Sequence, residues 1–247
     1  MDEISLHKGH GQYVLVISAP ELGLVLDVLP DRNKETFEKW LDERGKEWCA
    51  AVKVACSDMW DAYQEVAKAK LPNAKRVIDR FHVMKNLTDA ITKTRRTIQK
   101  EADEETKVLL KGCRWLLVKN KENLKAEERQ KLQRMLEASP TLKACYEFKE
   151  AFRDLFNQHL DYQTAEERLL AWVAGVEASE FNPLHSFAKT LRNWWQQILN
   201  YFDGRHNNGF AEGINLKIKM LNRRGYGYRN FNSFRLHVLV AFEPDPR

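Results

Sequence analysis

The chain has 247 residues, of which 43% are hydrophobic, so it is long enough to bury a substantial core as one large domain or as one domain with an insertion. Its net charge of +5 is by itself only weak evidence for a nucleic-acid partner. Its four cysteines form no CxxC pair and no short Cys/His cluster, which argues against a zinc finger and a disulfide framework. The absence of a long apolar run and of a secretory signal predicts a soluble cytoplasmic protein.

The first part of the chain alternates strand and helix patterns. Two strands are predicted at 12–18 and 22–29, separated by a turn at 19–21. A helix follows at 34–44, with Phe37, Trp40 and Leu41 on one face. A strand at 51–57, a helix at 60–70 and a short strand at 75–78 complete this part. This order implies a mixed sheet flanked by helices.

Strand signals disappear between about residue 83 and residue 201. Charged segments with apolar residues at helical spacing replace them, for example at 127–136 and 142–156. This all-helical block is either a separate domain or an insertion whose following helix returns to the sheet. We therefore expect a sheet part at 1–83, a helical insertion at 84–203 and C-terminal helices at 204–247.

Several carboxylates stand next to the predicted strands. Asp58 directly follows the strand at 51–57 and Asp79 follows the strand at 75–78, and the carboxyl ends of strands are where open α/β sheets place ligands. Either residue could instead cap the helix that follows it. Asp2 and Glu3 precede the first predicted strand. Nearby, His82 could be a metal ligand, a phosphate contact or a structural histidine.

A single acidic residue lies in a basic stretch near the end of the chain. Between 205 and 235 there are five arginines and two lysines but only one carboxylate, Glu212. Such a carboxylate suits an enzyme that holds a metal ion against a polyanion, although a solvated charged face is the commoner outcome. At helical spacing an apolar stripe lies opposite a charged face. The stripe is Phe210, Ile214, Ile218 and Leu221, and the charged face is Glu212, Lys219 and Arg223.

Two motifs carry a family resemblance. PNAKxxxDRFHV occurs at 72–83 and NGxxEGxNxxIK at 208–219, and together they are highly specific. With DEISLHKGHGQYV, LDVLPDRNKETFEKWL, VACSDMWDAY and KGCRWLLVKNKENL, they occur in the family's order over nearly the whole chain. The chain resembles the catalytic part of the ISL-three family of DDE transposases, which are bacterial insertion-sequence enzymes with a ribonuclease-H-like fold.

The resemblance implies a catalytic triad of Asp2, Asp58 and Glu212. In such enzymes the three carboxylates hold two Mg²⁺ or Mn²⁺ ions for cleavage and transfer of DNA strands. Asp79 and His82 lie in the family's DRFH motif, and we expect them to support the site. The expected DNA-binding residues are Lys217, Lys219, Arg223, Arg224 and Arg229.

The implied fold is a ribonuclease-H-like α/β sheet with a large helical insertion before the last catalytic helix. The implied partners are transposon-end and target DNA, with a possible homo-oligomer and no membrane, in a bacterial cytoplasm close to the nucleoid. Because the match begins at the family's first catalytic aspartate, we expect an N-terminally truncated member. The alternative is an inactive remnant that acts only as a DNA-binding or regulatory fragment.

Overall fold

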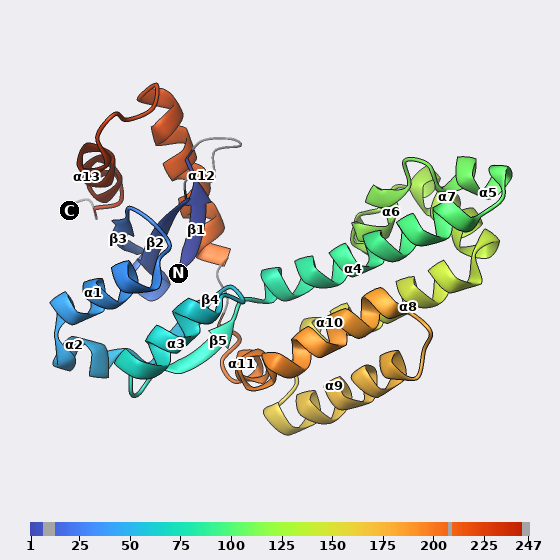
Figure 1. Ribbon diagram of the computed structural model, residues 1–247, viewed down its shortest axis with the longest axis horizontal. Helices are drawn as coiled ribbons and strands as arrows, with labels where there is room; N and C mark the ends of the chain where they lie inside the picture. The colour runs from blue at the N-terminus through green and yellow to red at the C-terminus, as the bar shows by residue number, and fades with distance from the viewer. Residues whose placement is uncertain (7–12, 207–208, 244–247) are drawn as a thin grey trace. The chain divides into compact units, whose positions relative to one another are not determined.

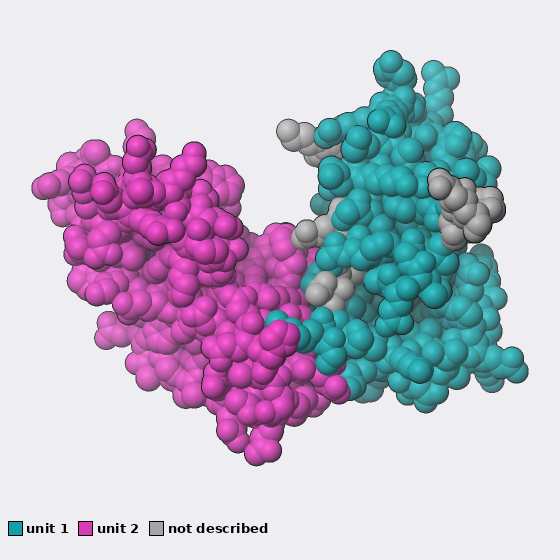
Figure 2. Space-filling model, turned by 180° about the vertical axis from the view of Figure 1, so that it is seen from behind, with its two compact units in different colours: residues 1–79, 204–247 teal, residues 80–203 magenta. Residues whose placement is uncertain are grey.

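The computed structural model describes residues 1–6, 13–206 and 209–243, except for the side chain of Glu212. The chain divides into two compact units, one formed by 1–79 with 204–247 and the other by 80–203 (Figures 1 and 2). Within the described ranges, no helix is both long and apolar enough to cross a membrane.

The first unit contains all five described strands. Its elements are β1 (Asp2–Ser5), β2 (Tyr13–Ala19), the 3-10 turn η1 (Pro20–Leu22), β3 (Leu24–Leu29), α1 (Lys34–Arg44), α2 (Lys46–Ala51), β4 (Val54–Ser57), α3 (Asp61–Lys70), β5 (Lys75–Ile78), α12 (Gly209–Arg224) and α13 (Phe231–Ala241). β1, β2 and β3 pair antiparallel in that order, and β4 pairs parallel with β5. The class is therefore mixed α/β.

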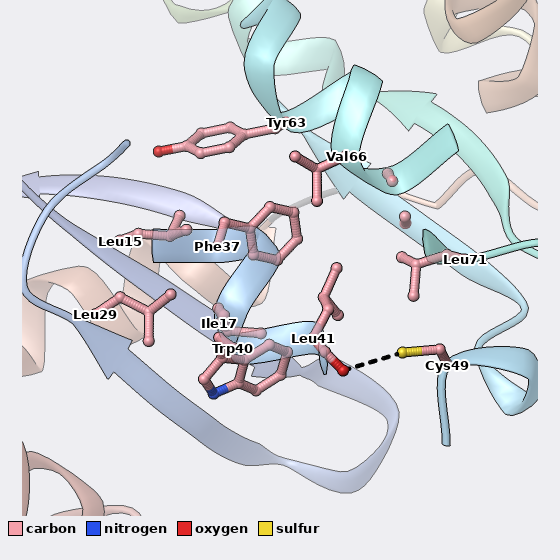
Figure 3. Packing of buried hydrophobic residues seen from close by; sticks show 12 residues of the cluster. Leu15, Ile17, Leu29, Phe37, Trp40, Leu41, Cys49, Tyr63, Val66 and Leu71 are labelled. Atoms are coloured by element: carbon pink, nitrogen blue, oxygen red, sulfur yellow. Dashed lines mark hydrogen bonds between the residues drawn. The ribbon is translucent and has the colours of Figure 1, made fainter. Parts of the chain in front are cut away.

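Helices cover both faces of the antiparallel strands, which explains why the segment from Val14 to Ile17 is apolar throughout. Leu15 and Ile17 point into a core formed with α1 and α3, where Phe37 and Tyr63 lie (Figure 3). Val14 and Val16, one position out of phase, pack on the other face. Their partners on α12 and α13 are Ile214, Ile218, Phe234 and Val238. The apolar stripe predicted for the C-terminal helix is thus confirmed.

A buried carboxylate ties three elements of this unit together. Asp27 on β3 is only 2% exposed and accepts hydrogen bonds from Trp40 Nε1 on α1 (2.8 Å) and from Arg235 Nε and Nη2 on α13 (2.5 and 2.8 Å). These donors and the Val28 amide outweigh desolvation, which alone would raise its pKa, so the pKa of Asp27 lies below the ordinary value. Asp27 therefore holds α1 and α13 against opposite faces of one strand.

The second unit is entirely helical. Its elements are α4 (Arg80–Glu101), α5 (Glu104–Leu110), α6 (Arg114–Val118), η2 (Lys121–Asn123), α7 (Ala126–Ala138), α8 (Pro140–Asn157), α9 (Tyr162–Glu177), α10 (Asn182–Asn193), α11 (Trp195–Leu199) and η3 (Asn200–Phe202). Phe152 and Phe156 on α8 lie at the centre of an aromatic core with Trp172 and Phe187. The buried Lys149 on α8 donates to the Leu117 carbonyl on α6 (2.7 Å), and this bond joins the two helices. Lys149 also pairs with Glu150 on its own helix (2.6 Å).

The local predictions hold for most elements of the first unit. The helix at 34–44 and the strand at 75–78 have the expected bounds, whereas the strand predicted at 51–57 begins only at Val54 because α2 extends to Ala51. Two expectations are wrong. Asp2 and Glu3 do not precede the first strand but belong to β1. The expected single mixed sheet is replaced by a three-stranded and a two-stranded sheet. The sequence of β1, DEIS, has two charged residues and only one large apolar residue, so it carries no strand pattern.

Candidate active site

Asp2 connects the start of the chain to a helix more than two hundred residues later. Its Oδ1 accepts a hydrogen bond from the Glu3 amide (2.8 Å), and its Oδ2 accepts one from Asn215 Nδ2 on α12 (2.5 Å). In Figure 1, α12 lies beside β1. Because side chains alternate along a strand, Asp2 shares the face of Ile4, which packs against α12 and α13. Asp2 is thus fixed both by β1 and by α12.

The first residue also joins the two sheets. The Met1 amino group donates a hydrogen bond of 2.9 Å to the Cys56 carbonyl on β4. The residue before β1 is thus bonded to a residue of β4 that lies two positions before Asp58. The strand order across this bond is β3-β2-β1, then β4-β5.

Asp58 and Asp79 occupy equivalent positions after neighbouring parallel strands. Ser57 pairs with Ile78 as the last residues of β4 and β5, and the Asp79 amide continues the ladder by donating to the Ser57 carbonyl (2.8 Å). Asp58 does not cap α3, since Trp60 occupies the N-cap position. Asp79 is 5% exposed and immediately precedes α4. Both carboxylates therefore lie at the carboxyl end of the two-stranded sheet.

The charges of Asp79 and Asp2 both act on the Cys56 thiol. Burial is the largest cause that raises the pKa of the Cys56 thiol to about 12. The N-terminal amino group opposes this shift, while the charges of Asp79 and Asp2 add to it. Cys56 is consequently a neutral thiol at physiological pH, and the two carboxylates that act on it are Asp2 on β1 and Asp79, directly after β5.

Glu3, which sequence reasoning assigned no role, anchors the other face of β1. Its Oε1 accepts from the Tyr63 hydroxyl on α3 (3.0 Å) and its Oε2 pairs with Arg32 (3.1 Å). Burial is the main cause that raises the pKa of Tyr63, and the charges of Glu3 and Asp58 raise it further. Glu3 and Asp58 thus lie near the same phenol, and Glu3 fixes β1 against α3.

The third carboxylate of the expected triad lies in α12, where the structure describes its backbone but not its side chain. Asn215 is three residues further along the helix, so positions 212 and 215 are on the same side of α12. The side of α12 that contains position 212 therefore faces Asp2. A search for polar residues one turn from Glu212 would have identified Asn215 in the sequence.

The donor types at these positions suit a hard divalent cation. Carboxylate oxygens of Asp2 and Asp58 and an amide oxygen of Asn215 are the ligand types that Mg²⁺ and Mn²⁺ accept. The Asn215 Oδ1 atom is buried, and no described residue donates a hydrogen bond to it. Among the side chains that the structure describes, no three acidic, histidine or cysteine groups converge closely enough to hold an ion by themselves. A complete ligand set would need position 212.

All five predicted DNA-binding residues are exposed, four of them on α12 and Arg229 in the loop after it. Lys217 also has a structural contact: its Nζ donates to the Ala241 carbonyl on α13 (2.5 Å) and lies 4.3 Å from the centre of the Phe242 ring. Lys219 and Arg223 lie on the same side of α12 as position 212.

His82 belongs to the second unit. It is the third residue of α4, and its ring meets the Phe81 ring edge-on at a centroid distance of 5.4 Å. Its proposed supporting role remains a prediction.

A family model and two known relatives that match nearly the whole chain agree on one family. The model of the ISL-three DDE family, described as a transposase, matches residues 1–238. The chain is 32% identical over its full length to the transposase for insertion sequence element IS1001 of Bordetella parapertussis, of which it covers 61%. It is 25% identical over 93% of its length to the transposase for insertion sequence element IS1557 of Mycobacterium tuberculosis, of which it covers 56%. The chain thus spans about three fifths of these relatives. No solved structure matches it.

Proposed function

Since this chain belongs to the ISL-three family of DDE transposases, we propose that it forms the catalytic region that cleaves and transfers DNA strands during insertion-sequence transposition. The supporting observation is the hydrogen bond from Asn215 to Asp2. It joins the first strand to the helix that contains Glu212, while the Met1–Cys56 bond joins the same strand to β4, just before Asp58. Three segments far apart in the sequence therefore converge near the proposed catalytic carboxylates.

We propose further that the fold is of the ribonuclease-H type. The strand order β3-β2-β1 followed by β4-β5, with three antiparallel strands and a parallel pair, supports this assignment. The helical block between β5 and α12 would be an insertion before the last catalytic helix, with Asp79 directly before it and His82 in its first helix.

Asp2, Asp58 and Glu212 would hold two Mg²⁺ or Mn²⁺ ions. Bound divalent ions supply an activated nucleophile and stabilise the leaving oxygen in phosphodiester chemistry. The chain's own contribution is positioning. The Asn215 amide fixes the Asp2 carboxylate, and β4 and β5 set Asp58 and Asp79 side by side at their carboxyl ends. Rigid strands suit this role because a metal site tolerates displacements of only about 0.5 Å.

The exposed cations of α12 would bind the phosphates of the DNA partner. Lys219 and Arg223 lie on the same side of the helix as position 212, and no acidic residue follows Glu212 before Glu243. Phosphate contacts of this kind give affinity and orientation but carry no sequence information.

The test of catalysis compares Asp58→Asn with Asp61→Asn in the full chain. Asp61 is exposed in the first turn of α3, three residues from Asp58, and serves as the matched control. Wild-type and Asp61→Asn proteins should nick and join supercoiled DNA that contains the element's ends when Mg²⁺ or Mn²⁺ is added. Asp58→Asn and Glu212→Gln should do neither.

A second readout follows metal binding without catalysis. Mn²⁺ should raise the thermal midpoint of the wild type and of Asp61→Asn, and should leave Asp58→Asn unchanged. If the wild type binds DNA but shows neither Mn²⁺ stabilisation nor nicking, the chain is a DNA-binding fragment and the catalytic proposal is wrong.

A further inference from the structure

The loop between α12 and α13 presents an unusual tyrosine. Tyr226 is 100% exposed, although a large aromatic side chain usually buries much of its surface. Its backbone has φ of +52°, the left-handed region that non-glycine residues rarely adopt. Neither the exposure nor the conformation of this residue contributes to a hydrophobic core.

The hydrogen bonds of this loop identify the position more closely. The Tyr226 amide donates to the Arg223 carbonyl (3.1 Å) and the Gly227 amide donates to the Asn222 carbonyl (2.9 Å). These two bonds form a Schellman motif, in which the left-handed residue after the helix is usually glycine. Tyrosine therefore occupies a position that folding alone would give to glycine, and backbone strain of this kind is typical of functional sites.

The neighbouring residues hold this loop in place. The ring of Tyr228 packs against the end of the helix so closely that a Cβ atom at Gly225 would lie 2.8 Å from its Cζ. The same ring contacts Phe234 and His237 on α13, at centroid distances of 5.4 and 5.2 Å. Tyr228 is thus an anchor, and Tyr226, two residues before it, points to solvent.

The surroundings of Tyr226 are cationic. Arg223, Arg224 and Arg229 are exposed, and no acidic residue lies between Asn222 and Asn230. Beside the loop is a pocket of about 500 Å³, lined by Tyr228 and Arg229 among others. Tyr13, Asp31 and Arg32 also line this pocket, and the Arg32 guanidinium stacks 4.5 Å from the centre of the Tyr13 ring. An aromatic surface surrounded by arginines is the arrangement that binds unpaired nucleotides, because the ring stacks on a base and the cations pair with phosphates.

We propose that Tyr226 is a stacking residue for an unpaired DNA base, with Arg223, Arg224 and Arg229 binding the adjacent phosphates. The proposal rests on the function proposed above, since a transposase acts on DNA whose strands are opened or cut. It explains why tyrosine is present where glycine would fold more easily. An intact duplex, whose bases are stacked on one another, should gain little from this residue.

The test exploits the glycine preference of the position. Binding of the full-length wild type and of Tyr226→Gly and Tyr226→Phe is measured by fluorescence anisotropy. The probes are a 20-nucleotide oligothymidine, the same strand with abasic sites in its centre, and a blunt duplex. Trp115→Ala is the matched control, because Trp115 is an exposed aromatic residue (68%) beside an arginine in the helical unit.

Tyr226→Gly should bind oligothymidine about 5- to 150-fold more weakly than the wild type, the range expected for one stacked base. Tyr226→Phe and Trp115→Ala should bind oligothymidine like the wild type. All four proteins should bind the duplex with the same affinity. On the abasic strand the wild type should bind as weakly as Tyr226→Gly. The thermal midpoint of Tyr226→Gly should equal or exceed that of the wild type, since glycine adopts the left-handed conformation without strain.

The proposal fails if Tyr226→Gly binds oligothymidine like the wild type, or if Trp115→Ala loses as much affinity. It also fails if the thermal midpoint of Tyr226→Gly falls below that of the wild type, because Tyr226 would then be a structural residue. Failure of the proposed function has a different signature: the wild type would bind none of the three DNAs.

Discussion

Replacing Asn215 by alanine tests whether α12 positions Asp2. The replacement removes the 2.5 Å hydrogen bond to the Asp2 carboxylate and leaves the apolar side of the helix intact. A hydrogen bond to a charged group contributes about 1.5–3 kcal/mol. Because both side chains are partly exposed, we expect the lower end, about 1.5 kcal/mol, which corresponds to about tenfold in an equilibrium constant. Residues that orient metal ligands commonly have effects of about 10- to 100-fold.

The assay is a Mn²⁺ titration of both DNA nicking and thermal stabilisation. Asn215→Ala should need about tenfold more Mn²⁺ for half of the maximal response, as the hydrogen-bond energy implies. Asn222→Ala is the matched control on the same helix, because Asn222 donates to the Leu6 carbonyl (3.2 Å) instead of to a carboxylate. The reasoning is refuted if Asn215→Ala responds to Mn²⁺ like the wild type, or if Asn222→Ala loses as much.

Three further predictions concern stability and DNA binding. Asp27→Ala should lower the free energy of unfolding by about 2–4 kcal/mol, because it leaves the buried Trp40 indole without an acceptor. The control is Asp42→Asn at an exposed position, which should lower it by under about 1 kcal/mol, and urea titrations would compare the two variants. Folding lowers the pKa of Asp27, so the ionised carboxylate stabilises the fold above its unfolded-state pKa, and this stabilisation is lost as the pH falls below about 4. The free energy of unfolding of Asp27→Asn should therefore depend less on pH over that range. Arg223→Ala and Arg224→Ala should each reduce the slope of log affinity for duplex DNA against log salt by about 0.9, and unchanged slopes in anisotropy titrations would exclude them as phosphate contacts.

Local pattern was sufficient for much of the first unit. The helix at 34–44 could be predicted because Phe37, Trp40 and Leu41 recur at helical spacing, and the strand at 75–78 because its apolar end follows a Pro-Asn turn. The strand β1 could not be predicted. Its four residues carry two charges, and it is stabilised by pairing with β2 and by contacts with α3 and α12, all distant in the sequence.

Some residues of the candidate site could be identified from the sequence, and the contacts of others required the structure. Asp58 was identifiable because it follows an apolar strand, and Glu212 because it is the single acid in a basic helix. Asp79 was also found from its position after a strand. By contrast, Lys217 looked like its neighbouring cations, and only the packing of α12 against α13 shows that it contacts Ala241 and Phe242. A run of cations does not reveal which of them touch another helix.

The sequence by itself determined the family, most helices and strands of the first unit and the apolar side of α12, because motifs and periodicity are local properties of the chain. Tertiary structure decided what these segments meet. It showed that Asp2 is bound by Asn215, that Met1 joins the two sheets, and that Tyr226 is held outward at a position suited to glycine. Each of these features depends on residues brought together by folding, and no pattern along the chain encodes such a distance.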